Sequence, residues 1–125
     1  MISNFETHFE QSVEKDSNGA YIVKRINFIE VINYLKNELN FSMLLDITGI
    51  DYLTYGTKQP HRFAVVYLLR SNDFKTQITL KVFVPGDMYL PSVTKFYKSA
   101  DWAEREVWDQ YGIHFSNHPN LKRVL

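Results

Sequence analysis

The sequence predicts an α+β domain with two layers, in which helices pack on a mostly antiparallel sheet of about four strands. Residues 63–70 are apolar at nearly every position, as is typical of a central strand covered on both faces. Residues 75–84 alternate between apolar and polar side chains, which indicates a strand with one solvated face. Apolar residues between positions 27 and 39 recur at helical spacing and predict a helix that packs on this sheet.

The first part of the chain contains shorter elements. Residues 5–13 predict a short helix, because their apolar side chains are four positions apart. Asn18-Gly19 predicts a turn, and residues 20–24 are rich in strand-forming side chains.

The helix at residues 27–39 has the clearest pattern. Asn27 is expected to cap its first turn, with Glu30 as the reciprocal partner three residues later. The apolar stripe that it would bury consists of Phe28, Val31, Ile32, Leu35 and Leu39.

The central strands follow. We expect a strand at residues 43–54 with a kink at Gly49, and a polar loop at residues 55–61. The residues Ser71-Asn72-Asp73 are typical of the turn of a hairpin between the two central strands.

The last third of the chain is predicted to be mainly helical. Pro85-Gly86-Asp87 ends the second central strand, and residues 93–97 predict a short helix. Residues 101–111 predict the closing helix, with Gly112 as the residue that terminates it.

Composition excludes several classes of protein. The 125 residues are enough for one domain, which we place at residues 1–125. Lysine plus arginine and aspartate plus glutamate both number 14, so no overall positive charge attracts nucleic acid. The chain has no cysteine, which excludes disulfides, thiolate nucleophiles and cysteine-bound iron–sulfur clusters within it. Its five scattered glycines do not form a phosphate-binding loop.

The longest apolar run, residues 63–69, is far shorter than the roughly 20 residues of a membrane-spanning helix. The first residues do not have the pattern of a secretory signal. We therefore expect a cytoplasmic protein, or one that partners hold at a membrane.

The closing segment, residues 101–125, concentrates charged and aromatic side chains. On a helical wheel, one side of residues 101–111 carries Ala103, Val107, Trp108 and Tyr111. The other side carries Trp102, Arg105, Glu106 and Asp109. Glu104 falls in the middle of the apolar side, where a carboxylate is costly unless it has a partner.

Two explanations for Glu104 stay open. Asp101 is a candidate N-cap residue, with Glu104 as its partner in the first turn. Alternatively, Glu104 forms a buried or interfacial ion pair with Arg62, Arg70 or Arg123, or with another chain. The spacing of Arg105 and Asp109, four positions apart, also favours a weak pair on the helix surface.

Catalytic and metal-binding interpretations of this segment are weak. Glu104 and Glu106 point in different directions on a helix, so they do not make an acid–base pair. Asp109, His114 and His118 resemble a zinc set only on a continuous helix, which Gly112 and the following proline disfavour. A histidine before a proline more often orders a turn through a hydrogen bond to the backbone.

The residues therefore predict an interaction module. Its candidate aromatic anchors are Trp102, Trp108, Tyr111 and Phe115, beside charges that can form specific pairs.

The stretch EREVWDQYGIHFSNHPNLKRVL resembles the signature of the thirty-kilodalton subunit of respiratory complex I, which is the C subunit of bacterial NADH:quinone oxidoreductase. The positions in register are Glu104, Arg105, Glu106, Asp109, Gly112, Ile113, Phe115, His118, Pro119, Leu121, Arg123 and Leu125. Upstream, LLDITGIDY, KVFVP, LPSV and SADW also resemble family sequences. Gln110 departs from the pattern, which usually has an apolar residue there. Many relatives continue beyond the position of Leu125, so we expect a truncated chain, a fragment of a longer or fused protein, or a short variant.

The resemblance implies a subunit that has no flavin or iron–sulfur cluster of its own. It implies that flavin, iron–sulfur clusters and quinone are bound by partner subunits. It implies a place in the hydrophilic arm on the cytoplasmic side of the membrane, packed mainly on the large forty-nine-kilodalton subunit. The chain would support electron transfer from NADH to quinone without catalytic residues of its own. The implied docking and signature residues are Trp102, Glu104, Arg105, Glu106, Trp108, Asp109, Tyr111, Gly112, Phe115, His118, Pro119 and Arg123.

Two alternatives remain. Energy-converting membrane-bound hydrogenases and related complexes use similar subunits with an electron donor other than NADH. A small metal-dependent enzyme that uses Asp109, His114 and His118 is the alternative of another class.

Overall fold

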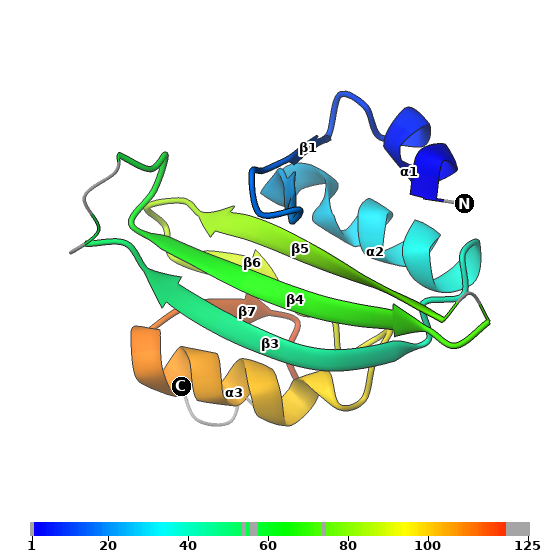
Figure 1. The fold of residues 1–125 in the computed structure, drawn as a ribbon. Helices are drawn as coiled ribbons and strands as arrows, with labels where there is room; N and C mark the ends of the chain where they lie inside the picture. The colour runs from blue at the N-terminus through cyan, green and yellow to red at the C-terminus, as the bar shows by residue number, and fades with distance from the viewer. Residues whose placement is uncertain (1, 54, 56–57, 74, 120–125) are drawn as a thin grey trace.

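The computed structural model describes residues 2–53, 55, 58–73 and 75–119. A five-stranded sheet has the strand order β1-β2-β5-β4-β3, and a second sheet consists of β6 and β7 (Figure 1). The predicted α+β class is confirmed, with one more strand in the main sheet than expected.

The elements follow one another in the order α1 (Ile2–His8), β1 (Val13–Lys15), β2 (Tyr21–Val23), the 3-10 helix η1 (Arg25–Asn27), α2 (Phe28–Asn37), β3 (Met43–Asp51), β4 (Phe63–Ser71), β5 (Thr76–Val84), β6 (Tyr89–Pro91), α3 (Ala100–Tyr111) and β7 (His114–Ser116). Strands β3, β4 and β5 pair antiparallel over nearly their whole length, whereas β2 joins β5 in parallel. No helix within these described ranges is long and apolar enough to cross a membrane.

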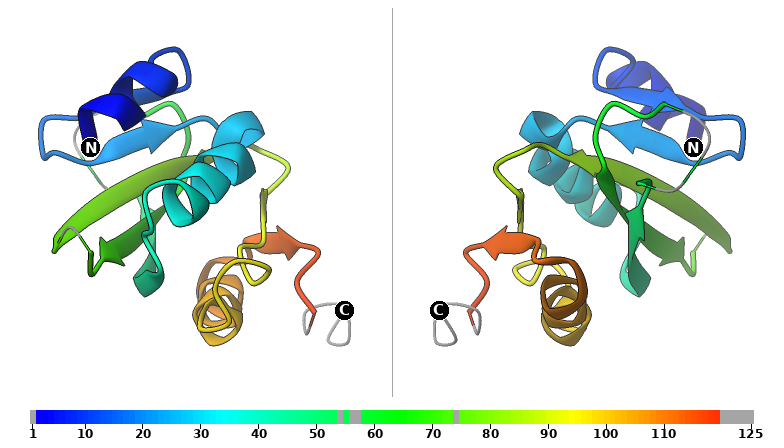
Figure 2. Two further views of the ribbon diagram at one scale, coloured as in Figure 1. Left: turned by 90° about the vertical axis from the view of Figure 1, so that its right-hand side faces the viewer. Right: turned by 90° about the vertical axis from the view of Figure 1, so that its left-hand side faces the viewer.

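Helices α2 and α3 cover the same face of the main sheet (Figure 2). Phe28 of α2 packs on Tyr67 of β4, with ring centroids 4.7 Å apart. Tyr111 of α3 packs on Phe63 of the same strand, at 5.9 Å. Because Phe63 and Tyr67 are an even number of residues apart, they lie on one face of β4. The core therefore lies between this face and the two helices, and the other face of the sheet carries neither of them.

Several short elements differ from the sequence-based prediction. The first helix ends at His8 rather than at residue 13, and Val13 begins strand β1 instead. Residues 93–97 form a hydrogen-bonded turn, in which the amides of Phe96 and Tyr97 both donate to the carbonyl of Val93 at 2.9 Å. Strands β6 and β7 were not predicted. Strands of three residues are too short to show an alternating pattern.

The helix predicted at residues 27–39 is confirmed and spans Phe28–Asn37, but the predicted cap is wrong. The Asn27 side chain makes no capping hydrogen bond. The turn of 3-10 helix at Arg25–Asn27 leads directly into α2, so Asn27 already has helical backbone angles. An N-cap residue needs a non-helical backbone for its side chain to reach the first amides.

Gly49 does not kink β3, which stays in register with β4 on both sides of it. The irregularity lies between Leu44 and Asp46. Gly49 instead allows the Tyr111 ring to lie against the strand, and the Tyr111 hydroxyl donates to the Gly49 carbonyl at 3.2 Å. A Cβ atom on residue 49 would lie 2.6 Å from Cδ2 of Tyr111. Gly49 is therefore required for close packing of α3 on β3.

We predict that Gly49→Ala destabilises the chain by roughly 1–3 kcal/mol, because the added methyl group displaces the Tyr111 ring. Chemical denaturation checks this value. Gly86→Ala is the matched control, since a Cβ at residue 86 meets no atom within 4 Å. In a Tyr111→Ala background the cost of Gly49→Ala should fall clearly, and an unchanged cost would contradict the account.

Candidate docking site at the closing helix

Helix α3 begins after Ser99 and ends at Gly112. Gly112 has a left-handed backbone with φ of 75°, and its amide donates to the Trp108 carbonyl at 2.8 Å. The predicted role of Gly112 in ending the helix is confirmed. The predicted cap at Asp101 is wrong, because Asp101 lies inside the first turn of the helix.

The two sides of α3 have the burial that the helical wheel predicts. Ala100, Glu104 and Val107 are buried against the sheet and its connections. Ala103, Trp108 and Tyr111 are partly buried and pack against the core. On the other side Trp102, Glu106, Asp109 and Gln110 are exposed.

Glu104 is completely buried, and its carboxylate accepts two hydrogen bonds from the turn that follows β6. The Ser92 hydroxyl donates to Oε1 at 2.6 Å. The backbone amide of Val93 donates to Oε2 at 2.8 Å. Glu104 therefore joins α3 to this turn through hydrogen bonds rather than through an arginine.

The arginines proposed as partners of Glu104 are engaged elsewhere or lie outside the described residues. Arg62 forms a bidentate pair with Asp51, with both N–O distances at 2.9 Å. Arg70 donates to Asn72 at 3.2 Å. Arg123 lies outside the described residues. The predicted pairing with Arg62 or Arg70 is therefore wrong.

His118 holds the segment after β7 against the first turn of α3. Its ring is completely buried, and Nε2 lies 3.0 Å from the backbone oxygen of Asp101. The same nitrogen is 3.3 Å from Oδ1 of Asp101 and 3.8 Å from Oε1 of Glu104. The predicted hydrogen bond from this histidine to the backbone is confirmed. The exposed Pro119 follows it in a turn.

These groups form one polar cluster, which is buried except for the partly exposed side chain of Asp101 and which we call the polar lock: Ser92, the Val93 amide, Asp101, Glu104 and His118. It ties together three segments that are separate in the sequence, namely the turn after β6, helix α3 and the residues after β7. An interior carboxylate is stable only when its hydrogen bonds are satisfied, so the lock fixes how α3 lies.

Burial is the main cause that raises the pKa of Glu104 from 4.5 to about 7. The bonds from Ser92 and Val93 lower the pKa in part, and the nearby charge of Asp101 raises it further. Burial holds the pKa of the Tyr67 hydroxyl well above its ordinary value, and the charge of Glu104 raises that pKa further. The carboxylate of Glu104 thus sits in a poorly solvated interior.

The outward side of α3 carries the candidate docking groups. Trp102 is 66% exposed, which is high for a tryptophan. The Arg105 guanidinium lies 5.9 Å from its ring centroid, within cation–π distance. No ion pair joins Arg105 to Asp109 among the described residues, so the predicted surface pair is not formed. The helix therefore presents the exposed carboxylates of Glu106 and Asp109 beside this aromatic and cationic pair.

The aromatic anchors divide between surface and core. Phe115 is buried with the hydrophobic core, so it does not present its ring to a partner. Trp108 is half-buried and lies beside His114, with ring centroids 6.4 Å apart. Only Trp102 among the four predicted anchors is both large and mostly exposed.

The proposed zinc set does not come together. Asp109 is exposed on α3, whereas His118 is buried in the polar lock. Across the part of the chain that the structure describes, no three His, Asp or Glu side chains are placed to hold a metal ion.

Sequence reasoning missed Ser92 and the Val93 amide as the partners of Glu104. In the sequence, the stretch LPSV that contains both residues is marked only by its resemblance to the family. A serine and a backbone amide 12 and 11 residues before the glutamate give no signal in the pattern of charges.

We predict that Glu104 makes the chain less stable as the pH rises from about 4.5 to about 7. The native state binds this proton more tightly than the unfolded state, so stability is lost as the carboxyl ionises. This pKa shift corresponds to a loss of at most roughly 3 kcal/mol in the free energy of unfolding. Urea denaturation of the wild type and of Glu104→Gln across this range checks it.

The difference in unfolding free energy between the wild type and Glu104→Gln should change between about pH 4.5 and about pH 7 and become constant above pH 7. Glu106→Gln is the control, because Glu106 is exposed on the same helix. A wild type and a Glu104→Gln variant with parallel stability curves would contradict the assignment.

The family model described as the 30 kDa subunit of respiratory-chain NADH dehydrogenase matches residues 21–125. The C subunit of the NADH-quinone oxidoreductase of Trichlorobacter lovleyi is 40% identical over 99% of this chain and 78% of its own length. The NADH-ubiquinone oxidoreductase subunit 9 of Reclinomonas americana is 35% identical over the whole chain and 60% of its own length. The chain spans between about half and four fifths of the length of such relatives.

Solved structures show the same fold. A structure titled "Nqo5 of the trypsin-resistant fragment (1-134) in P63 form" superposes with a TM-score of 0.83 and 35% identity, covering 95% of this chain and 98% of that one. A chain of an archaeal membrane-bound sulfane sulfur reductase has a TM-score of 0.76 at 22% identity, which shows a shared fold. It covers 94% of this chain and 69% of the other. By sequence and by fold, this chain belongs to the family of the 30 kDa subunit of respiratory-chain NADH dehydrogenase.

Proposed function

We propose that the chain is a non-catalytic assembly subunit in the hydrophilic arm of a proton-translocating NADH:quinone oxidoreductase. It docks on the large forty-nine-kilodalton-type subunit through the outward side of α3. The chain supports electron transfer from NADH to quinone by holding its neighbours in place. It lies on the cytoplasmic side of the membrane, where its partner subunits hold it.

The observation that carries this proposal is the contrast between the two sides of α3. The inner side is fixed by the polar lock and by Tyr111 packed on Gly49. The outer side presents Trp102 to solvent, with the Arg105 guanidinium within cation–π distance of its ring. A rigid helix that exposes a large aromatic side chain beside a cation is typical of the centre of a protein interface.

The chemistry of the chain fits a role without cofactors of its own. It contains no cysteine to ligate an iron–sulfur cluster. Glu104, the acid with the raised pKa, is sealed inside the polar lock and is not placed to exchange protons with a substrate. Flavin, iron–sulfur clusters and quinone therefore belong to the partner subunits in this proposal.

The electron donor is the part of the proposal that a direct assay must decide. The fold also occurs in an archaeal respiratory membrane complex with a different substrate. The second candidate is the equivalent subunit of a membrane-bound hydrogenase-type complex, which the resemblance of the closing segment leaves open. Purification of the tagged chain with its partners in mild detergent tests both. Iron-rich material that reduces quinone with NADH supports the proposal, and material that oxidises hydrogen supports the second candidate.

We predict that Trp102→Ala lowers the amount of the chain recovered in the assembled complex by about tenfold or more. Loss of a central aromatic anchor typically costs about 2 kcal/mol or more of binding free energy. The measurement is the yield of the co-purified large subunit, of the forty-nine-kilodalton type, per tagged chain.

Leu45→Ala is the control, because Leu45 is also a large apolar residue with an exposed side chain and lies on β3, outside α3. The unfolding free energy should change little in either variant. Equal recovery of the wild type and Trp102→Ala would overturn the assignment of this docking surface.

A further inference from the structure

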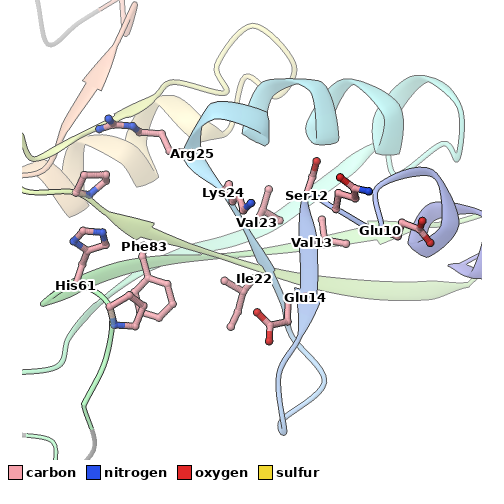
Figure 3. A pocket seen from close by; sticks show the side chains of 13 residues that line it. Glu10, Ser12, Val13, Glu14, Ile22, Val23, Lys24, Arg25, His61 and Phe83 are labelled. Atoms are coloured by element: carbon pink, nitrogen blue, oxygen red, sulfur yellow. The ribbon is translucent and has the colours of Figure 1, made fainter.

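A groove of about 660 Å³ opens at the β1 and β2 side of the sheet (Figure 3). It is lined by residues 10–14 and 22–25, by Pro60 and His61, and by Phe83 and Pro85. The side chain of Ile22 lies on the face of the sheet away from α2 and α3, because its neighbours Tyr21 and Val23 are buried in the core.

The floor of the groove is apolar. Ile22 and Phe83 come from the neighbouring strands β2 and β5, and both are half-buried. Pro60 and Pro85 also line it. Prolines lack a backbone donor, so this part of the floor offers surface for apolar contact rather than for hydrogen bonds.

The aromatic surface continues outside the groove. Phe83 lies 5.9 Å from the ring of Tyr52, and Tyr52 lies 5.0 Å from the ring of Tyr55. Tyr55 is 58% exposed. Clustered aromatic rings beside a groove are enriched at protein interfaces rather than on surfaces that face only solvent.

The walls of the groove carry opposite charges. Glu10 and Glu14 lie on the β1 side, and neither forms an ion pair among the described residues (Figure 3). Lys24 follows β2 beside Ser12, with its amide 3.4 Å from the Ser12 carbonyl, and Arg25 lies toward the other side, where it is paired with Asp87 at 2.6 Å. Glu14 is the cross-strand neighbour of Ile22, so the acidic wall borders the apolar floor directly.

We propose that this groove binds a segment of a second protein partner, in which a large apolar side chain is next to a lysine or arginine. The apolar side chain covers Ile22 and Phe83, and the basic side chain pairs with Glu10 and Glu14. A single apolar anchor with an adjacent complementary charge gives both affinity and orientation.

The groove and α3 lie on opposite faces of the main sheet. Ile22 on the floor of the groove faces away from the core, whereas α3 packs on the core face at β3. A chain with one docking surface on each face can bridge two neighbours, as an assembly subunit does. The inference rests on the proposed function in this respect, because it assigns a second contact within the same assembly.

The test places the photo-cross-linking residue p-benzoylphenylalanine at Ile22 of the tagged chain in cells that make the whole complex. The same residue at Trp102 is the positive control, and at the exposed Glu38 it is the negative control. A second probe at Glu14, which is exposed, serves if the Ile22 variant is unstable. Cross-linked peptides are identified by mass spectrometry after purification.

We expect the Ile22 probe to cross-link to one protein segment that contains an apolar residue beside a lysine or arginine. The double variant Glu10→Lys/Glu14→Lys should lower the cross-linked yield at least about threefold, because it replaces attraction by repulsion. Glu38→Lys is the charge-matched control and should leave the yield unchanged. Reversing the charge of the mapped basic residue should restore the yield with the double variant.

If the complex is recovered, any of three results would overturn the assignment of the groove as a docking site. The first is a cross-link at Trp102 with none at Ile22 or Glu14. The second is an adduct with a lipid or small molecule, and the third is a protein segment without a basic residue. Failure of the chain to co-purify with any complex would instead overturn the proposed function, and this inference with it.

Discussion

The desolvated carboxylate of Glu104 constrains the packing of the closing part of the chain, because a buried charge without donors would destabilise the fold. Its two donors come from the turn after β6, and the neighbouring His118 comes from the residues after β7. The carboxylate therefore specifies where three segments meet. Apolar packing alone tolerates small shifts of a helix, whereas a buried hydrogen bond is lost when its partners move by about 1 Å.

The orientation of α3 follows from that constraint and from the packing at Gly49. The Tyr111 ring lies against β3 at the far end of the helix, where any side chain on residue 49 would meet it. The polar lock holds the first turns, and this contact holds the last one. The outward position of Trp102 is a consequence of these two fixed ends rather than of any contact that Trp102 makes itself.

Much of the architecture could be predicted from the sequence, because the central strands and α2 are long enough to show their periodicity. The helical wheel of α3 also predicted which side is buried, and it identified Glu104 as the residue that breaks the pattern. The partner of Glu104 could not be predicted. The sequence left open a capping role with Asp101 and an ion pair with an arginine or another chain. A hydroxyl and a backbone amide satisfy the carboxylate instead, and neither has a charge that marks it in the sequence. The three-residue strands and the role of Gly49 depend on tertiary contacts, which local patterns do not contain.

The position of the outward side of α3 depends on the polar lock. Amide hydrogen exchange at Val93, followed by NMR, tests this most directly, because that amide donates to Glu104. The account predicts strong protection of the Val93 amide in the wild type. It also predicts a large loss of that protection in Glu104→Ala, while the amide of Val66 in β4 stays protected. Rapid exchange at Val93 in the wild type, or equal protection in the variant, would contradict it.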